Sequence, residues 1–320
     1  MLRTAESVSP QHPDKLCDQV SDAILDTVLA GDKQARVAVE TAGGHGELYI
    51  VGEVTTDATV DYEQTARKVV GADIAIRVNI AQQSPEIAQG VDTGGAGDQG
   101  IMVGYATSET DNLMPLEYDL ARELNQHIFE HFPYDGKTQI TTDNNAIAAV
   151  VASFQHATQK ELQELVAEWI RDKSTVKQPA LHLNPAGDWD QGGFDSDAGL
   201  TGRKLMVDNY GPRIPIGGGA FSGKDYTKVD RSAAYAARKV AVDYLQKHNA
   251  KEVYCYLSYA IGVAEPVQAT VIIDGKENAV EGYDLTPAGI RQLLDLENQT
   301  YLQTAQWGHF GNGFSWDIAR

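Results

Sequence analysis

The chain has 320 residues, with 26 basic and 45 acidic side chains and a formal net charge of −19. This balance argues against a nucleic-acid or anionic-membrane binder, and no apolar run is long enough to span a bilayer. The first fifteen residues lack the apolar core of a signal peptide, and two cysteines, Cys17 and Cys255, provide no disulfide framework. We therefore expect a globular, cytoplasmic protein that binds neither nucleic acid nor membrane.

Helix, strand, strand and helix are predicted three times in succession. The first helices are expected from Pro13 to Gly31, at Pro115–Phe132 and at Arg231–His248, the last capped by Asp230. The paired strands are expected at Ala35–Glu40 with Glu47–Thr56, Lys137–Thr142 with Ala146–Phe154, and Glu252–Tyr259 with Val267–Asp274. The second helices are expected near Thr59–Val70, from a Thr158–Glu161 capping box to Lys173, and from Thr286 to Leu296. This order predicts three α+β units, although many mixed folds alternate helices and strands anyway.

Basic residues concentrate in one part of this acidic chain. Between Thr201 and Lys239 there are eight basic residues and three acidic ones. A specific anion site explains this concentration, and so does an ordinary solvated basic face.

The segment His12-Pro13-Asp14-Lys15 is the first candidate site. With Pro13 as the first helical residue, His12 caps the helix and Asp14 lies in its first turn. A helix N-terminus favours anions, a histidine there can donate to a phosphate, and an aspartate can hold Mg²⁺ between phosphates. The alternative is a structural histidine beside an aspartate that only stabilises the helix.

A glycine-rich segment, GGGAFSGKD at 217–225, is the second candidate site. Its spacing imitates a P-loop, but Asp225 stands where Ser or Thr belongs, and no clear buried strand precedes it. What remains is a flexible loop carrying Lys224, followed by Lys228 and a carboxylate able to bind Mg²⁺, Asp230. Such a set suits a polyphosphate, and the alternative is a mobile surface loop.

Three further carboxylates lie in suggestive places. Asp98 follows a second glycine turn, while Glu40 and Glu53 fall on two paired strands. A monovalent metal or an ammonium-bearing substrate would suit these glutamates, and so would plain exposure to solvent. The sequence shows no CxxC, HExxH or Gly-x-Ser-x-Gly motif and no dinucleotide-binding glycine pattern after a strand.

Together these segments resemble the S-adenosylmethionine synthetase (methionine adenosyltransferase) family. The resemblance runs through most of the chain and is carried most specifically by GAGDQG at 95–100 and GGGAFSGKD at 217–225, with HPDK at 12–15 and GLTGRK at 199–204 in the same order. It implies three similar α+β domains, with mixed sheets covered by helices, about a pseudo-threefold axis. We expect them at 1–90, 91–190 and 191–320, with the chain crossing between domains.

The resemblance also implies a reaction. The sulfur of L-methionine attacks C5′ of ATP, and the displaced tripolyphosphate is hydrolysed to pyrophosphate and phosphate. Two Mg²⁺ and one K⁺ assist, and the active sites lie between the subunits of a homodimer, with a tetramer left open.

The resemblance assigns roles residue by residue. Catalytic roles fall to His12, which donates at the leaving oxygen, to Asp98 beside the sulfur, and to Lys137, Arg203, Lys224 and Lys228. The contacts to ATP are His12, Asp135, Lys137, Trp189 stacked on adenine, Asp197, Arg203, Lys204, Ala220 and Lys224. Methionine is held by Glu53, Gln83, Asp197 and Lys228, Mg²⁺ by Asp14 and Asp230, and K⁺ by Glu40.

Two departures from the family pattern leave other functions open. Asp188 stands where an arginine is usual, which reverses the charge expected near the nucleotide, and the lid loop at Asp92–Gly95 is shorter. A catalytically weak sensor of nucleotide or S-adenosylmethionine is therefore the alternative. An enzyme that only hydrolyses tripolyphosphate is a third hypothesis, although it would not need Glu53, Gln83 or Asp98.

Overall fold

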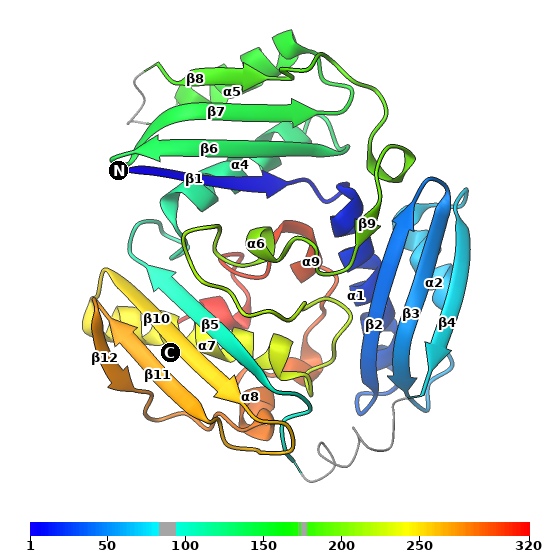
Figure 1. Ribbon diagram of the computed structural model, residues 1–320, viewed down its shortest axis with the longest axis vertical. Helices are drawn as coiled ribbons and strands as arrows, with labels where there is room; N and C mark the ends of the chain where they lie inside the picture. The colour runs from blue at the N-terminus through cyan, green and yellow to red at the C-terminus, as the bar shows by residue number, and fades with distance from the viewer. Residues whose placement is uncertain (83–93, 172, 174–177) are drawn as a thin grey trace.

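The computed structural model describes residues 1–82, 94–171, 173 and 178–320 and contains three sheets arranged around a centre of helices and connecting segments (Figure 1). The first sheet has the strand order β4-β3-β2-β9, the second β1-β6-β7-β8 and the third β12-β11-β10-β5. Their bounds are β1 Leu2–Val8, β2 Arg36–Gly44, β3 Glu47–Thr55, β4 Ala75–Ala81, β5 Gly100–Thr107, β6 Gly136–Asp143, β7 Ala146–Phe154, β8 Ala180–Leu183, β9 Gly199–Leu200, β10 Glu252–Tyr259, β11 Gln268–Ile273 and β12 Lys276–Ala279. The pairs β3–β4 and β7–β8 are parallel and the other pairs are antiparallel, so the predicted α+β class is confirmed.

The helices follow the predicted order. The long helices α1, α4 and α7 each pack on one sheet, and α2, α5 and α8 follow the paired strands. Their bounds are α1 Pro13–Gly31, α2 Tyr62–Val70, α4 Leu116–Phe129, α5 Gln159–Arg171, α7 Val229–His248 and α8 Pro287–Leu293, with short helices α6 Leu205–Asp208 and α9 Thr304–Trp307. No helix of the described residues is long and apolar enough to cross a membrane.

Capping residues explain why several helices begin where they do. His12 accepts a hydrogen bond from the backbone of Asp14, and Thr286 accepts one from the backbone of Gly289. Thr158 and Glu161 form the predicted reciprocal capping box at α5. The prediction that Asp230 caps α7 is wrong, because Lys228 is the N-cap residue and the Asp230 side chain pairs with Lys224 instead.

Each sheet receives one edge strand from another part of the chain, and sequence periodicity did not predict these strands. β1 pairs with β6 in the second sheet, β5 with β10 in the third and β9 with β2 in the first. The range 1–90 thus gives β1 to the sheet of 91–190, which gives β5 to the sheet of 191–320, which in turn gives β9 to the sheet of 1–90 (Figure 1). β5 lacks polar alternation because it is buried on both faces, and a Cβ on Gly104 would lie 2.0 Å from the carbonyl oxygen of Ala237 in α7.

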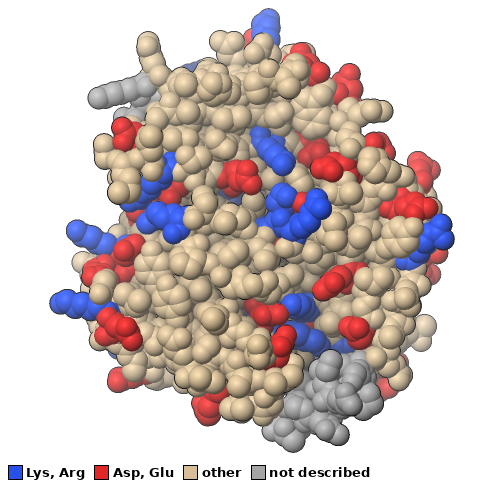
Figure 2. Space-filling model, viewed as in Figure 1, with Lys and Arg blue, Asp and Glu red and all other residues tan. Residues whose placement is uncertain are grey.

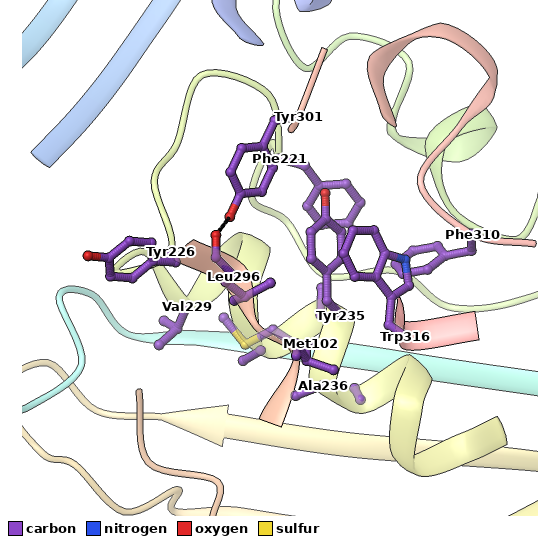
Figure 3. Packing of buried hydrophobic residues seen from close by; sticks show 14 of the residues in the cluster. Met102, Phe221, Tyr226, Val229, Tyr235, Ala236, Leu296, Tyr301, Phe310 and Trp316 are labelled. Atoms are coloured by element: carbon purple, nitrogen blue, oxygen red, sulfur yellow. Dashed lines mark hydrogen bonds between the residues drawn. The ribbon is translucent and has the colours of Figure 1, made fainter. Parts of the chain in front are cut away.

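An aromatic cluster joins α7 to the C-terminal segment (Figure 3). Tyr235 stacks on Trp316 with ring centroids 3.8 Å apart, and its hydroxyl is 2.7 Å from Nδ1 of the fully buried His309. Burial, followed by the positive charges of Arg231 and Lys15, lowers the pKa of His309 well below its usual value. The imidazole is therefore neutral in the folded chain.

We expect this histidine to make the fold sensitive to acid. Between its unfolded pKa near 6.5 and its lower folded pKa, only the unfolded chain binds the proton, so the free energy of unfolding falls as pH drops, by up to about 1.4 kcal/mol per pH unit. The free energy of unfolding, measured with denaturant at several pH values from 7 to 5, should fall less steeply with pH for His309→Gln than for the wild type. Equal slopes in the two proteins would contradict this assignment.

Candidate active site

The N-terminus of α1 holds the first candidate residue in a defined protonation state. Nδ1 of His12 accepts from the backbone N–H of Asp14 at 3.1 Å, which leaves the proton on Nε2. Burial, with the nearby charges of Lys204 and Lys137, lowers the pKa of His12 to about 3. A neutral imidazole with a free Nε2–H can donate a hydrogen bond to an anionic oxygen.

Asp14 is fully buried and lies among cations. One carboxylate oxygen accepts from the backbone N–H of Leu200 at 2.9 Å and forms an ion pair with Nε of Arg203 at 2.9 Å, and the other accepts from Nζ of Lys204 at 2.5 Å. Burial by itself would raise the pKa of Asp14, but the hydrogen bonds from Lys204 and Leu200 lower it overall. Asp14 is thus a carboxylate whose charge is balanced by two candidate phosphate-binding residues.

The pairing of β1 with β6 brings further predicted site residues close to His12 and Asp14. In the β1–β6 pairing Val8 lies opposite Lys137, and the chain then runs directly into His12 and α1. Asp135 accepts from the backbone of Gly193 at 3.0 Å. We call this set the His12 group, and it comprises His12, Asp14, Asp135, Lys137, Asp197, Arg203 and Lys204.

Trp189 lies four residues before Gly193, whose backbone binds Asp135 of the His12 group. Its Nε1 donates to the hydroxyl of Ser153 at 3.1 Å, and a Cβ on Gly192 would lie 2.8 Å from its ring. The indole is half-buried, so part of the ring stays accessible to a planar ligand.

The glycine-rich loop and the start of α7 form the second set, the Lys224 group, which comprises Ala220, Lys224, Asp225, Lys228 and Asp230. Nζ of Lys224 lies 2.7 Å from Asp230, and Nζ of Lys228 lies 2.5 Å from the buried Asp225. The loop is attached to the edge of β2, with a bridge between Ala38 and Lys224. A cavity of about 550 Å³ beside the loop is lined by Gln99, Ile101, Gly217 and Gly218, among others. This volume is within the usual range of small-molecule sites.

The remaining predicted residues are exposed in the single chain. Glu40 on β2 and Glu53 on β3 point to the outer face of the first sheet, since their neighbours on either side along each strand point the other way. Asp98 lies in the turn before β5, and its carboxylate accepts from the backbone of Gln99. Lys137 and Asp197 are also exposed. Gln83 lies outside the described residues, as does part of the Asp92–Gly95 loop.

The carboxylates fit metals that bind together with a substrate. Among the described residues no three His, Cys, Asp or Glu side chains gather into a metal-binding cluster. Asp14 and Asp230 are single carboxylates, each beside lysine or arginine side chains that are candidates for binding phosphate. Mg²⁺ usually binds one or two carboxylates plus substrate phosphates. Gly219 presses its backbone against Asp230, since a Cβ there would lie 2.1 Å from the carboxyl carbon. Glu40 is exposed, and within the described chain its carboxylate has no hydrogen-bond or ion-pair partner, which leaves it accessible to a monovalent cation.

Two observations change the sequence-based picture. The carboxylate of Asp188 accepts from the backbone of Gln159 at 2.9 Å and from the side chain of Asn184 at 3.3 Å. It therefore lies at the N-terminus of α5, where negative charge is stabilising. Sequence reasoning also gave no role to Asp18, Asp22 and Asp225. For the first two a signal was visible, because aspartates recur every four residues along α1.

Family models match the chain in three consecutive segments. The N-terminal domain of S-adenosylmethionine synthetase matches residues 1–87, its central domain matches residues 93–189, and its C-terminal domain matches residues 191–318.

The contact between Gly219 and Asp230 supplies a test of the Lys224 group. A methyl group at Gly219 would displace the carboxylate, so we expect Gly219→Ala to weaken binding of tripolyphosphate with Mg²⁺ by about 10- to 100-fold in isothermal titration calorimetry. Gly218→Ala is the matched control, because a Cβ at Gly218 meets nothing within 4 Å. Equal affinities for the two variants would show that this contact does not shape the site.

Proposed function

Because three family models together match nearly the whole chain, the chain belongs to the S-adenosylmethionine synthetase family, and we propose that it makes S-adenosylmethionine from ATP and L-methionine. The observation that carries the proposal is Asp14, held between Arg203 and Lys204 beside a neutral His12. This arrangement suits a polyphosphate leaving group and needs no base, since a thioether attacks as a neutral nucleophile.

In the proposed reaction the sulfur of methionine forms a bond to C5′ of ATP, and the C5′–O5′ bond breaks with its electron pair on tripolyphosphate. The Nε2–H of His12 donates to the departing oxygen. Water then cleaves the bound tripolyphosphate into pyrophosphate and phosphate. The phosphates are held by Lys137, Arg203, Lys204, Lys224 and Lys228.

The remaining proposed roles concern metals, nucleoside and methionine. Asp14 and Asp230 would hold Mg²⁺, which would neutralise phosphate charge, and Glu40 would hold K⁺. Trp189 stacks on adenine, while Asp135, Asp197 and Ala220 complete the nucleotide site. Methionine is held by Glu53, Gln83, Asp197 and Lys228, and Asp98 steadies the forming sulfonium. The buried free thiols of Cys17 and Cys255 suit a cytoplasmic enzyme.

We further propose a homodimer in which each active site takes the His12 group from one copy and the Lys224 group from the other. Within the described chain no hydrogen bond or ion pair joins the charged side chains of the two groups. Exposed apolar side chains flank exposed site residues, as Val51 does for Glu53 and Ile101 for Asp98, with exposed fractions of 41% and 61% for the two apolar residues. A second copy would cover these surfaces.

The alternative functions have less support. The sensor hypothesis depended on Asp188, whose carboxylate contacts the start of α5, and on the short Asp92–Gly95 loop, part of which lies outside the described residues. A pure tripolyphosphatase has no use for the exposed carboxylates Glu53 and Asp98.

One assay tests the proposed reaction. The protein with ATP, L-methionine, Mg²⁺ and K⁺ should yield S-adenosylmethionine, with pyrophosphate and phosphate in equal amounts, as resolved by chromatography. A parallel reaction without methionine should yield no S-adenosylmethionine and far less phosphate. ATP binding without any product would favour the sensor, and cleavage of tripolyphosphate alone would favour the hydrolase.

A complementation experiment tests the shared site. His12→Ala and Lys228→Ala should each fold normally and lose S-adenosylmethionine synthesis by orders of magnitude. Mixed dimers contain one site with both substitutions and one with neither, so random re-association of the two variants should restore about a quarter of wild-type activity. No recovery, despite mixed dimers detected by mass spectrometry, would place both residues in a site formed by one copy.

A further inference from the structure

Two turns that carry candidate phosphate-binding residues are fastened to the same helix in the same way. Gly202 and Gly223 have φ of 77° and 79°, and each directly precedes a cation, Arg203 or Lys224. The backbone N–H of each glycine donates at 2.8 Å to a buried aspartate of α1, Gly202 to Asp18 and Gly223 to Asp22.

The two aspartates are one helical turn apart, so their separation is set by the helix. The turns also touch each other, since a Cβ on Gly202 would lie 2.4 Å from Cβ of Ala220. On Gly223 a Cβ would lie 1.9 Å from the carbonyl oxygen of Val39, which excludes any other residue there. Both turns are thus confined against α1 and β2.

Asp22 and a buried arginine hold the second turn from both sides. Arg231 donates to the two oxygens of Asp22 at 2.7 and 2.8 Å, and the same guanidinium donates to the carbonyl oxygen of Lys224 at 3.2 Å. Asp22 and Arg231 are almost fully buried. The pair therefore fixes both the N–H of Gly223 and the C=O of Lys224, and with them the direction in which the Lys224 side chain leaves the backbone.

We propose that Asp18 and Asp22 are positioning residues: Asp18 aims Arg203, and Asp22 aims Lys224, at the polyphosphate of the site that each cation serves in the proposed dimer. This inference rests on the proposed function, because the function identifies what these cations bind. Neither aspartate touches the substrate, since each acts through the backbone of a glycine turn.

The same helix provides a matched control. Asp26 lies one further turn along α1 and accepts the backbone N–H groups of Tyr301 and Leu302 at 2.8 and 2.9 Å. These residues belong to neither the His12 group nor the Lys224 group. Asp26→Ala therefore removes a partly buried carboxylate and two similar backbone hydrogen bonds, away from the phosphate-binding residues.

The test compares Asp18→Ala, Asp22→Ala and Asp26→Ala with the wild type. We expect all three to lower the melting temperature. Only the first two should weaken binding of tripolyphosphate with Mg²⁺ and raise KM for ATP, by about 10- to 100-fold, while KM for methionine stays within about twofold. If Asp22→Ala does not fold, Asp22→Ala with Arg231→Met removes both buried charges and is measured in the same way.

Each outcome decides the inference. Loss of tripolyphosphate affinity in the Asp18 and Asp22 variants, but not in the Asp26 variant, supports positioning. Equal affinity in all three variants and the wild type overturns it and shows a purely structural role. A wild type that binds tripolyphosphate but makes no S-adenosylmethionine overturns the proposed reaction, while the binding comparison still tests the positioning role.

Discussion

The structure depends on four carboxylates of one helix, of which Asp14, Asp18 and Asp22 are buried and Asp26 is partly buried. Asp14, Asp18, Asp22 and Asp26 lie at fourfold spacing on α1, and each accepts at least one backbone N–H from a distant segment. A buried carboxylate is costly unless it is hydrogen-bonded, and a buried N–H is costly unless it finds an acceptor. Each carboxylate supplies the acceptor that a buried N–H needs, and each N–H supplies the donor that the carboxylate needs. The segments around residues 200, 223 and 301 must therefore lie along α1.

The exchange of edge strands has a comparable effect on the site. β1 pairs with β6 and then leads directly into α1, which brings Lys137 toward His12 across more than a hundred residues of sequence. β5 joins the third sheet, so that Gly100 at its start lies beside Asp230. The candidate site therefore requires all three sheets in their relative places, and no single domain contains it.

Charge pairing is the main electrostatic feature of the candidate site. In the described chain Asp14 is paired with Arg203 and Lys204, and Asp230 with Lys224. These carboxylates thus offset the mutual repulsion of the neighbouring cations. In the proposed function the carboxylates would hold Mg²⁺ and the cations would hold the polyphosphate, so the binding of either one would favour the binding of the other.

The sequence by itself determined the features that depend on local interactions. Helix caps at His12, Thr158 and Thr286, the threefold order of helices and paired strands, and the two glycine-rich segments are all encoded within a few residues of one another. The family motifs then indicated most of the candidate site, because side chains of a motif keep their chemistry wherever the chain places them.

Only the tertiary structure decided the long-range pairings. Edge strands β1, β5 and β9 find partners far away in sequence, and a strand buried on both faces carries no alternation to reveal it. Asp18, Asp22 and Asp188 each accept a backbone N–H from a segment far away in sequence, and a backbone donor has no side-chain signature that residue types could reveal. Burial also decided the protonation state of His12, which it keeps neutral. It decided the partners of the α1 carboxylates as well, because each of them needs a backbone N–H donor.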